Sequence, residues 1–354
     1  MTDAGDRIPV NLLTGFLGSG KTTLLNRLLR EADGSAIAVL VNELGEIGLD
    51  HELLARIDDA TVVLEGGCVC CTVGDSLAAA MRDLLRRRER GEVPAFKRLV
   101  IETTGLADPA PIIASLATEP VLRHRYRLST VIATVDALHG TAELARHREC
   151  ARQVAAADRL MITKDDLCSA DAVGALESQL RQLNPTAVVA RTNRDVLDPR
   201  ALLASDAFDP ASKGEEARRW LAMPETAGGR GDRTRLAAAR HGSDIAAICL
   251  TVDAPLDWSA FGIWLTMLLH RHAPRVLRVK GLLSVTGFRG PVLVQCVQHT
   301  IHPLVHLDAW PSDDRRSRLV LIVENIERER LLRSLDSFNR LTSGAPATAS
   351  AGIA

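Results

Sequence analysis

The chain has 354 residues, about twice the length of a typical single domain, so the sequence predicts two domains. Hydrophobic residues make up 46% of the chain and charged residues 25%, an ordinary globular composition that excludes a disordered or fibrous chain. The formal net charge is −1, from 43 basic and 44 acidic residues, so neither a nucleic acid nor a membrane surface is expected as a partner.

The first two hundred residues alternate short apolar runs with longer helical patterns. The runs are apolar almost throughout, which is typical of strands covered on both faces. Repeated strand–helix units predict the α/β class, a mostly parallel sheet with helices on both faces and ligands beyond the carboxyl ends of its strands. The predicted strands are Ile8–Leu13, Ala36–Val41, Thr61–Leu64, Leu99–Ile101, Thr130–Val135, Leu160–Thr163 and Ala187–Ala190, and the predicted helices include Thr22–Arg30 and Asp75–Arg88.

Beyond residue 200 the pattern changes. Residues 201–243 include a Gly- and charge-rich stretch, 227–233, and are predicted to form a linker. Residues 244–340 are predicted to form a smaller α+β domain, and 341–354 a disordered tail. The second domain has predicted strands at Ile245–Val252, Val276–Val285, Val292–Val297 and Leu319–Val323, and predicted helices at Trp258–Leu269 and Glu327–Leu335.

Targeting signals and cysteine usage predict a cytoplasmic protein. The segment MTDAGDRIPV lacks the apolar stretch of a secretory signal, and no later run approaches the ~20 apolar residues of a membrane helix. Three of the seven Cys crowd into positions 68–71, a spacing that favours a metal or redox site in a reducing compartment. Lys is used sparingly, so each one is a candidate for chemistry that Arg cannot perform. They are Lys21, Lys97, Lys164, Lys213 and Lys280.

The strongest motif is GFLGSGKTT, which fills the pattern G-x-x-x-x-G-K-[ST] with Gly15, Gly20, Lys21 and Thr22. It follows a predicted strand and opens a predicted helix, as a phosphate-binding loop requires. Glycines let backbone N–H groups point at phosphate oxygens, and the helix amino end adds positive potential. The Lys supplies a charge to the β- and γ-phosphates, and the Thr hydroxyl is predicted to ligate Mg²⁺.

A second motif, Ile101-Glu102-Thr103-Thr104-Gly105, ends a β-branched run. The Glu102 carboxylate at the strand tip is predicted to hold the water shell of the magnesium ion, and Gly105 to approach the γ-phosphate through its N–H. The alternative is an ordinary acid at the end of a strand.

A third motif, Thr163-Lys164-Asp165-Asp166, also follows an apolar strand and matches the pattern [NT]-K-x-D by which GTPases read the base. A carboxylate at Asp166 accepts hydrogen bonds from both N1–H and the amino group of guanine, which adenine does not offer, and the Lys164 stem is predicted to lie over the ring. A polar site left unpaired by the wrong base rejects that base. GTP is therefore favoured over ATP.

The motif Gly66-Gly67-Cys68-Val69-Cys70-Cys71-Thr72 predicts a metal site. Thiolates favour Zn²⁺ and also accept Co²⁺ and Ni²⁺. Because the backbone constrains three thiols so close together, two thiolates plus an acid or His from elsewhere are the expected ligands. Glu46 is the candidate acid, since it follows an earlier strand at the same sheet edge. The alternative is that the Cys side chains are small buried hydrophobes.

With these motifs in this order, the sequence resembles the CobW-like family of P-loop GTPases, which are metal-handling relatives of the urease and hydrogenase maturation GTPases. The resemblance covers nearly the whole chain. It rests on TGFLGSGKTTLLN, VNELGEIGLD, GGCVCC, IETTGLADP and TKDD, and in the second domain on VLRVKGLL, VQCVQH and SRLVLIV.

The resemblance implies a GTPase of low intrinsic turnover whose nucleotide state controls the binding of a metal or its transfer to a client protein, with zinc favoured and cobalt as the alternative. It implies phosphate and Mg²⁺ binding by the loop, a Walker-B-like acid, guanine recognition, and a transferable metal. By position these functions fall on Gly18, Ser19, Gly20, Lys21, Thr22 and Thr23; on Glu102; on Lys164 and Asp166; and on Cys68, Cys70, Cys71 and Glu46.

Two departures from the family matter. Some relatives place a Glu where this chain has Val41, and many carry a His-rich linker of which only His241 remains. Three alternatives stay open: cobalt or iron delivery for cobalamin synthesis or nitrile hydratase activation, a non-enzymatic metal and nucleotide sensor, and an ATP-dependent kinase. The sequence identifies neither the client nor the oligomeric state, so a homo-oligomer also stays open.

Overall fold

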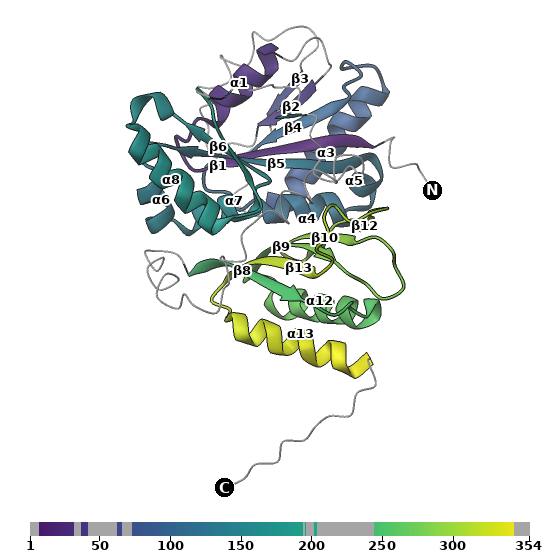
Figure 1. Cartoon of the computed structure of the whole chain (residues 1–354). Helices are drawn as coiled ribbons and strands as arrows, with labels where there is room; N and C mark the ends of the chain where they lie inside the picture. The colour runs from purple at the N-terminus through teal and green to yellow at the C-terminus, as the bar shows by residue number, and fades with distance from the viewer. Residues whose placement is uncertain are drawn as a thin grey trace.

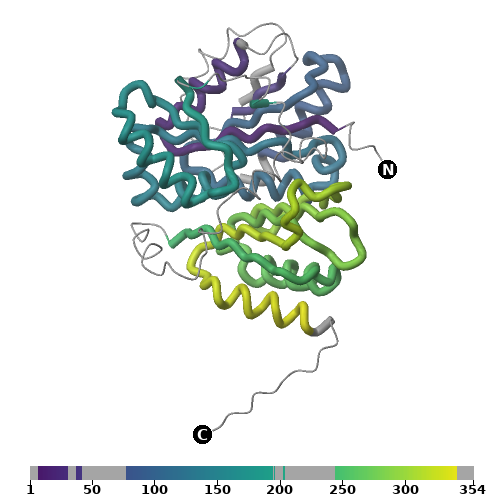
Figure 2. The backbone as a smooth tube through the Cα atoms, viewed as in Figure 1, coloured from purple at the N-terminus to yellow at the C-terminus, as the bar shows by residue number. Residues whose placement is uncertain are grey.

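The computed structural model describes residues 7–31, 37–41, 62–65, 73–193, 195, 202–203 and 244–342. These residues form two sheets with their helices, and each sheet belongs to a different half of the chain (Figure 1). Figure 2 shows the second unit, in green and yellow, lying along one side of the first. None of the described helices is long and apolar enough to cross a membrane.

The first sheet has seven strands among the described residues, in the order β3-β2-β4-β1-β5-β6-β7. Every pairing is parallel, which confirms the predicted α/β class. Strand β2 is wholly buried and β5 nearly so, which explains why the predicted runs here are apolar almost throughout. The strands are β1 (Ile8–Gly15), β2 (Ile37–Val41), β3 (Val62–Glu65), β4 (Arg98–Glu102), β5 (Tyr126–Asp136), β6 (Arg159–Thr163) and β7 (Val188–Arg191).

Helices connect and cover these strands. Two of them start at side-chain caps: Glu119 accepts from the amide of Leu122, and Ser169 accepts from the amide of Ala172. The helices are α1 (Lys21–Glu31), α3 (Val73–Glu89), α4 (Ala110–Thr118), α5 (Pro120–Arg125), α6 (Gly140–Arg146), α7 (Arg148–Ala156) and α8 (Ala170–Leu183), with a 3-10 turn, η2 (Asp165–Leu167).

The second sheet is antiparallel, in the order β11-β10-β9-β13-β8, with β12 also paired to β10. Helices α12 (Trp258–His272) and α13 (Arg328–Thr342) pack together, and the buried Trp264 indole donates to Ser334 Oγ of α13 at 2.9 Å. The four longer strands match the predicted runs. The strands are β8 (Ile245–Val252), β9 (Val276–Leu283), β10 (Val292–Val297), β11 (Thr300–Ile301), β12 (Val305–His306) and β13 (Ser317–Glu324).

The second sheet lies between the first unit and its own two helices (Figure 1). Helices α7, α8 and α4 contact β9, β8 and β11, respectively. The apolar contact is continuous, because Ile245, Leu277 and Ile322 belong to the same buried cluster as residues of α7. The two units therefore share a core and are not joined only by the chain between them.

The predicted linker and tail are described only at their edges. Leu202 and Leu203, near the start of the predicted linker, are buried at 3% exposure each, and the Asn11 side chain donates to the Leu203 carbonyl at 3.2 Å. Helix α13 continues to Thr342, past the predicted start of the tail. Residues 204–243, with the Gly-rich stretch 227–233, lie outside the described residues.

Candidate nucleotide and metal site

The predicted motifs meet at one edge of the first sheet. Strands β4, β1, β5 and β6 are neighbours in that order and run parallel, so their carboxyl ends share an edge. Those ends are Glu102, Gly15, Asp136 and Thr163. The edge of a parallel sheet beyond its carboxyl ends is where this fold class binds ligands.

The loop between β1 and α1 is fixed by hydrogen bonds at its base and open at its tip. Ser19 donates its amide to Phe16 O at 3.2 Å, and its buried hydroxyl bonds the Thr134 hydroxyl at 2.7 Å. Gly18 is exposed with φ +69°, a conformation that glycine adopts without strain, and nothing lies within 4 Å of where a side chain would begin. The loop therefore presents backbone toward open space, as phosphate binding requires.

Helix α1 begins at Lys21, so the next residues form its first turn. The half-buried Lys21 turns back over the loop and donates from Nζ to Phe16 O at 3.2 Å. Thr22 is half-buried, and Thr23 is exposed. An ammonium group held above a loop of backbone amides is placed to meet phosphate oxygens.

Thr22 and Glu102 come together although 80 residues separate them. The Thr22 hydroxyl donates to Glu102 Oε1 at 2.6 Å, and Glu102 is only 3% exposed. Hydroxyl and carboxylate oxygens are the ligands that Mg²⁺ prefers, alone or through its bound waters. This pair therefore fits a magnesium ion.

The segment after β4 lies directly against the phosphate loop. Thr103 donates its amide to Leu13 O at 2.9 Å and its hydroxyl to Thr14 Oγ1 at 2.9 Å. A side chain at Gly105 would meet the backbone of Leu17 at 2.6–2.7 Å, so only glycine allows this approach. The residues after β4 and the phosphate loop are therefore in direct contact.

The end of β6 is tied to the same loop. Thr163 Oγ1 donates to Ser19 O at 2.8 Å. Lys164 follows in the left-handed region, with φ +56°, and its Nζ donates to Asp136 Oδ2 at 2.6 Å. Burial raises the pKa of Asp136, but hydrogen bonds from Lys164 and from the Leu138 amide outweigh burial and hold the pKa below its ordinary value.

A pocket of about 280 Å³ opens beside this segment. The Asp166 carboxylate at its rim is exposed and accepts from Asn193 Nδ2 at 2.7 Å, while the buried Asp165 accepts from the same group at 3.1 Å and from the Asn193 amide at 3.2 Å. The lining residues are Asp165, Asp166, Cys168, Ala170, Val173, Arg191 and Asn193.

Two residues of this site were not predicted from the sequence. Asn193 follows β7, and no local motif marks it. Asp136 ends β5, and its signal was a lone acid directly after the apolar run Thr130–Val135, at the sheet edge where ligands bind.

Comparison with known families agrees with this geometry. Residues 9–191 match the model of the CobW/HypB/UreG nucleotide-binding domain, and residues 245–339 match the carboxyl-terminal domain of the cobalamin synthesis protein CobW. The chain belongs to the CobW family. It is therefore a member of a P-loop family of GTPase type, and the two matched regions correspond to the two sheets.

Several characterised proteins resemble this CobW-family chain along most of its length. The zinc chaperone YjiA of Escherichia coli is 34% identical over 92% of this chain and 96% of its own length. The zinc chaperone CobW of Pseudomonas aeruginosa is 30% identical over 93% and 91%. The crystal structure of Zn(II)-bound YjiA GTPase from E. coli superposes with a TM-score of 0.71 at 30% identity, covering 94% of this chain and 99% of that one.

The predicted metal ligands Cys68, Cys70, Cys71 and Glu46 lie outside the described residues. The strands that precede them, β2 and β3, are described and are neighbours in the sheet. Val41, the last residue of β2, pairs with Glu65 of β3 and with Glu102 of β4. The carboxyl ends of β2 and β3 therefore lie next to each other, and the end of β2 lies next to Glu102 of β4.

Two of the four Cys in the described part of the chain, Cys150 and Cys296, are buried and are poor metal ligands. Burial raises the pKa of Cys150 and of Cys296 to about 12 each, so both are protonated at neutral pH. Cys168 and Cys249 are half-buried. Within the described ranges, no group of three or more His, Cys, Asp or Glu side chains is arranged to hold a metal ion.

Proposed function

We propose that this chain is a GTP-hydrolysing metallochaperone that couples its nucleotide state to the binding and transfer of zinc to a client protein. The observation that carries the proposal is the strand order at the site edge. Val41 pairs with both Glu65 and Glu102, so the strand that precedes Glu46 ends beside the acid that bonds Thr22, and the strand that precedes the Cys motif ends one strand further along the same sheet edge. The relatives named zinc chaperones support zinc as the cargo.

The local geometry supports the proposed nucleotide roles. The open loop around Gly18, with Gly15, Ser19 and Gly20, presents backbone amides to the phosphates, and Lys21 and Thr23 at the start of α1 complete the phosphate contacts. Gly105 brings its backbone to the γ-phosphate side of that loop. Thr163, Lys164 and Asp166 hold the guanine base beside the pocket lined by Asn193.

Thr22 and Glu102 would hold the magnesium ion, the second as a Walker-B-like acid. When bound, the ion neutralises charge that develops on the β- and γ-phosphate oxygens. The chain itself contributes the Lys21 charge, the oriented amides of the loop and the fixed position of Glu102, held by a 2.6 Å hydrogen bond. Hydrolysis on this account rests on positioning and electrostatics.

The zinc cargo would be held by two thiolates from the set Cys68, Cys70 and Cys71, together with Glu46. Thiolates are preferred ligands of zinc, and two thiolates with one carboxylate make three protein ligands, which leaves the fourth tetrahedral position open for exchange. GTP would order residues 42–50 and 66–75 together, and hydrolysis would release one of them and change the affinity for zinc. An order–disorder change of this kind is a recurring device in nucleotide switches.

Guanine recognition gives a direct test of the nucleotide part. Asp166→Asn is expected to lower the affinity for GTP by about 10²-fold or more, because an amide cannot accept from both N–H groups of guanine. The same variant is expected to gain affinity for xanthosine triphosphate, whose carbonyl at position 2 accepts from the new amide. Competition of GTP, ATP and xanthosine triphosphate against a fluorescent nucleotide measures both changes.

A neighbouring acid supplies the matched control. Asp171 is exposed in the first turn of α8 and is not among the pocket residues, so Asp171→Asn should leave all three affinities unchanged. Equal GTP affinities in wild type and Asp166→Asn, or a wild type that binds ATP as tightly as GTP, would contradict guanine recognition by this segment.

A further inference from the structure

The loop that follows β4, residues 105–108, is bonded to helix α7. The Gln153 amide donates to Gly105 O and to Ala107 O, both at 3.0 Å. Gln153 is 1% exposed, so these bonds are made without competition from water. One buried side chain therefore fixes the same glycine that lies against Leu17 of the phosphate loop.

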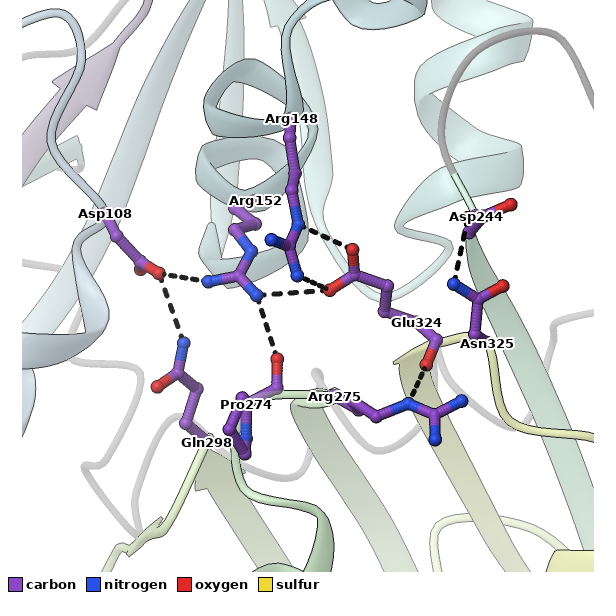
Figure 3. Close-up of polar contacts among 9 residues, drawn as sticks. All are labelled: Asp108, Arg148, Arg152, Asp244, Pro274, Arg275, Gln298, Glu324 and Asn325. Carbon is purple, nitrogen blue, oxygen red and sulfur yellow. Dashed lines mark hydrogen bonds and ion pairs between the residues drawn. The ribbon is translucent and has the colours of Figure 1, made fainter.

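The adjacent residue on α7, Arg152, joins this loop to the second unit (Figure 3). Its guanidinium donates to Asp108 Oδ2 at 2.8 Å in the loop, and to Pro274 O at 2.9 Å and Glu324 Oε2 at 3.1 Å in the second unit. The side chains of Arg152 and Glu324 are 16% and 10% exposed. A single cation thus bridges the nucleotide-side loop and the end of β13.

Two further contacts in Figure 3 involve Asp108 and Glu324. Gln298, just after β10, donates to Asp108 Oδ2 at 3.3 Å, so the second unit also touches the loop directly. Arg148, one turn before Arg152 on α7, bonds Glu324 at 2.6 Å. Arg148 and Arg152 therefore share Glu324, but the hydrogen bond to Asp108 is made by Arg152.

The network is charged and largely withdrawn from water. Burial raises the pKa of Glu324, but hydrogen bonds from Arg148 and Arg152 outweigh burial and hold the pKa below its ordinary value. Glu324 is therefore ionised at neutral pH. Partly buried charge-assisted bonds depend strongly on position, so displacement of Asp108 weakens the contact across the interface.

We infer that the carboxyl-terminal unit senses the γ-phosphate through Arg152, because docking at Asp108 holds the loop 105–108 in the position that closes on the phosphate loop. The inference rests on the proposed function and adds a partner surface to it, within the same chain. Few contacts connect the phosphate loop to the second unit. Leu17 touches Gly105, and the Gln153 side chain bonds the carbonyls of Gly105 and Ala107. Arg152 then links Asp108 to Glu324. Coupling of this kind is reciprocal, so GTP also strengthens docking of the second unit.

The test compares two arginines that share Glu324, in the full chain with magnesium. Arg152→Gln is expected to lower the affinity for a non-hydrolysable GTP analogue by about fivefold or more, the low end of allosteric coupling, and to leave GDP affinity unchanged. Arg148→Gln breaks an ion pair across the same interface without touching Asp108, so both affinities should stay within about twofold of wild type. Circular dichroism checks that both variants fold.

A second variant approaches Asp108 from the other side. Gln298 has φ +47°, which Asn tolerates better than most residues, so Gln298→Asn keeps the backbone and shortens the donor. It should lower analogue affinity in the same direction as Arg152→Gln. It also keeps the test available if the arginine variant does not fold.

Amide hydrogen exchange distinguishes coupling through Arg152 from a purely structural role of this residue. The Glu324 amide donates to Arg275 O at 2.7 Å, and its protection should differ between the GDP and GTP-analogue states of wild type but not of Arg152→Gln. Unchanged analogue affinity in Arg152→Gln and Gln298→Asn would overturn the coupling and leave the proposed GTPase intact. A wild type that binds neither nucleotide would overturn both.

Discussion

Lys21→Ala is expected to reduce single-turnover GTP hydrolysis by about a hundred- to a thousandfold, the effect of removing one electrostatic donor from a preorganised site. The Nζ atom lies 3.2 Å from Phe16 O of the phosphate loop, where, on the proposed function, it would stabilise the negative charge of the transferred phosphoryl group. Lys21 opens α1 and is half-buried, so the substitution leaves the core of the first unit intact.

Lys97→Ala is the matched control for that measurement. Lys97 is exposed just before β4, so its removal takes away the same charge at a distance from the loop and should leave the rate unchanged. Hydrolysis by Lys21→Ala at the wild-type rate would show that the phosphate loop is not the catalytic site. The proposed enzyme activity would then fail.

The second large effect is expected at Asp158, between α7 and β6. Its carboxylate accepts from the Val131 amide at 3.0 Å, bonds the Arg278 guanidinium and lies 3.1 Å from Lys280 Nζ. The three side chains are at most 6% exposed. Asp158→Ala should cost about 3–5 kcal/mol in the free energy of unfolding, because it leaves two cations buried without this anion. Urea unfolding followed by circular dichroism measures the change.

The pKa of Asp158 sets the pH range over which its carboxylate stabilises the folded protein. Burial raises the pKa, but the charges of Arg278 and Lys280 outweigh burial and hold it below its ordinary value. A carboxyl group with a lowered pKa in the folded state stabilises the protein above its unfolded pKa of about 3.9, and this stability is lost as pH falls through the folded pKa. The difference in the free energy of unfolding between wild type and Asp158→Ala should therefore have its full value at pH 7 and become smaller only at strongly acidic pH.

An exposed pair on α3 is the control for this measurement. Asp83 bonds Arg86 at 3.0 Å with side chains 51% and 65% exposed, so Asp83→Ala should cost at most about 1 kcal/mol. A similar small loss for Asp158→Ala would mean that the buried ion cluster does not hold the two units together.

The sequence predicted the parts of the fold that depend on residues close together in the chain. Apolar runs marked the strands because buried parallel strands are apolar on both faces, and the motifs at their ends marked the sheet edge. Strands β11 and β12 have only two residues each, which is too short for a periodic pattern. Asn193 was missed because its role exists only once β7 and η2 lie side by side.

The interface between the two units is marked in the sequence by charged residues within an apolar strand, but only the structure shows what they contact. The apolar strand Val276–Leu283 contains Arg278 and Lys280, two residues apart and therefore on one face. Such charges in a buried strand require a partner, but nothing local identifies Asp158, which lies 120 residues away. The Arg152 network is equally non-local, since it joins helix α7 to Glu324 of β13.

The central claim, that nucleotide and zinc sites are coupled, is tested most directly by the affinity of the full chain for a non-hydrolysable GTP analogue with and without saturating zinc. The account predicts a change of at least about fivefold, and the same factor for zinc when the nucleotide is varied. Replacing Cys68, Cys70 and Cys71 together with Ser should abolish the zinc effect and leave zinc-free nucleotide affinity unchanged. Identical nucleotide affinities with and without zinc in wild type would contradict the account.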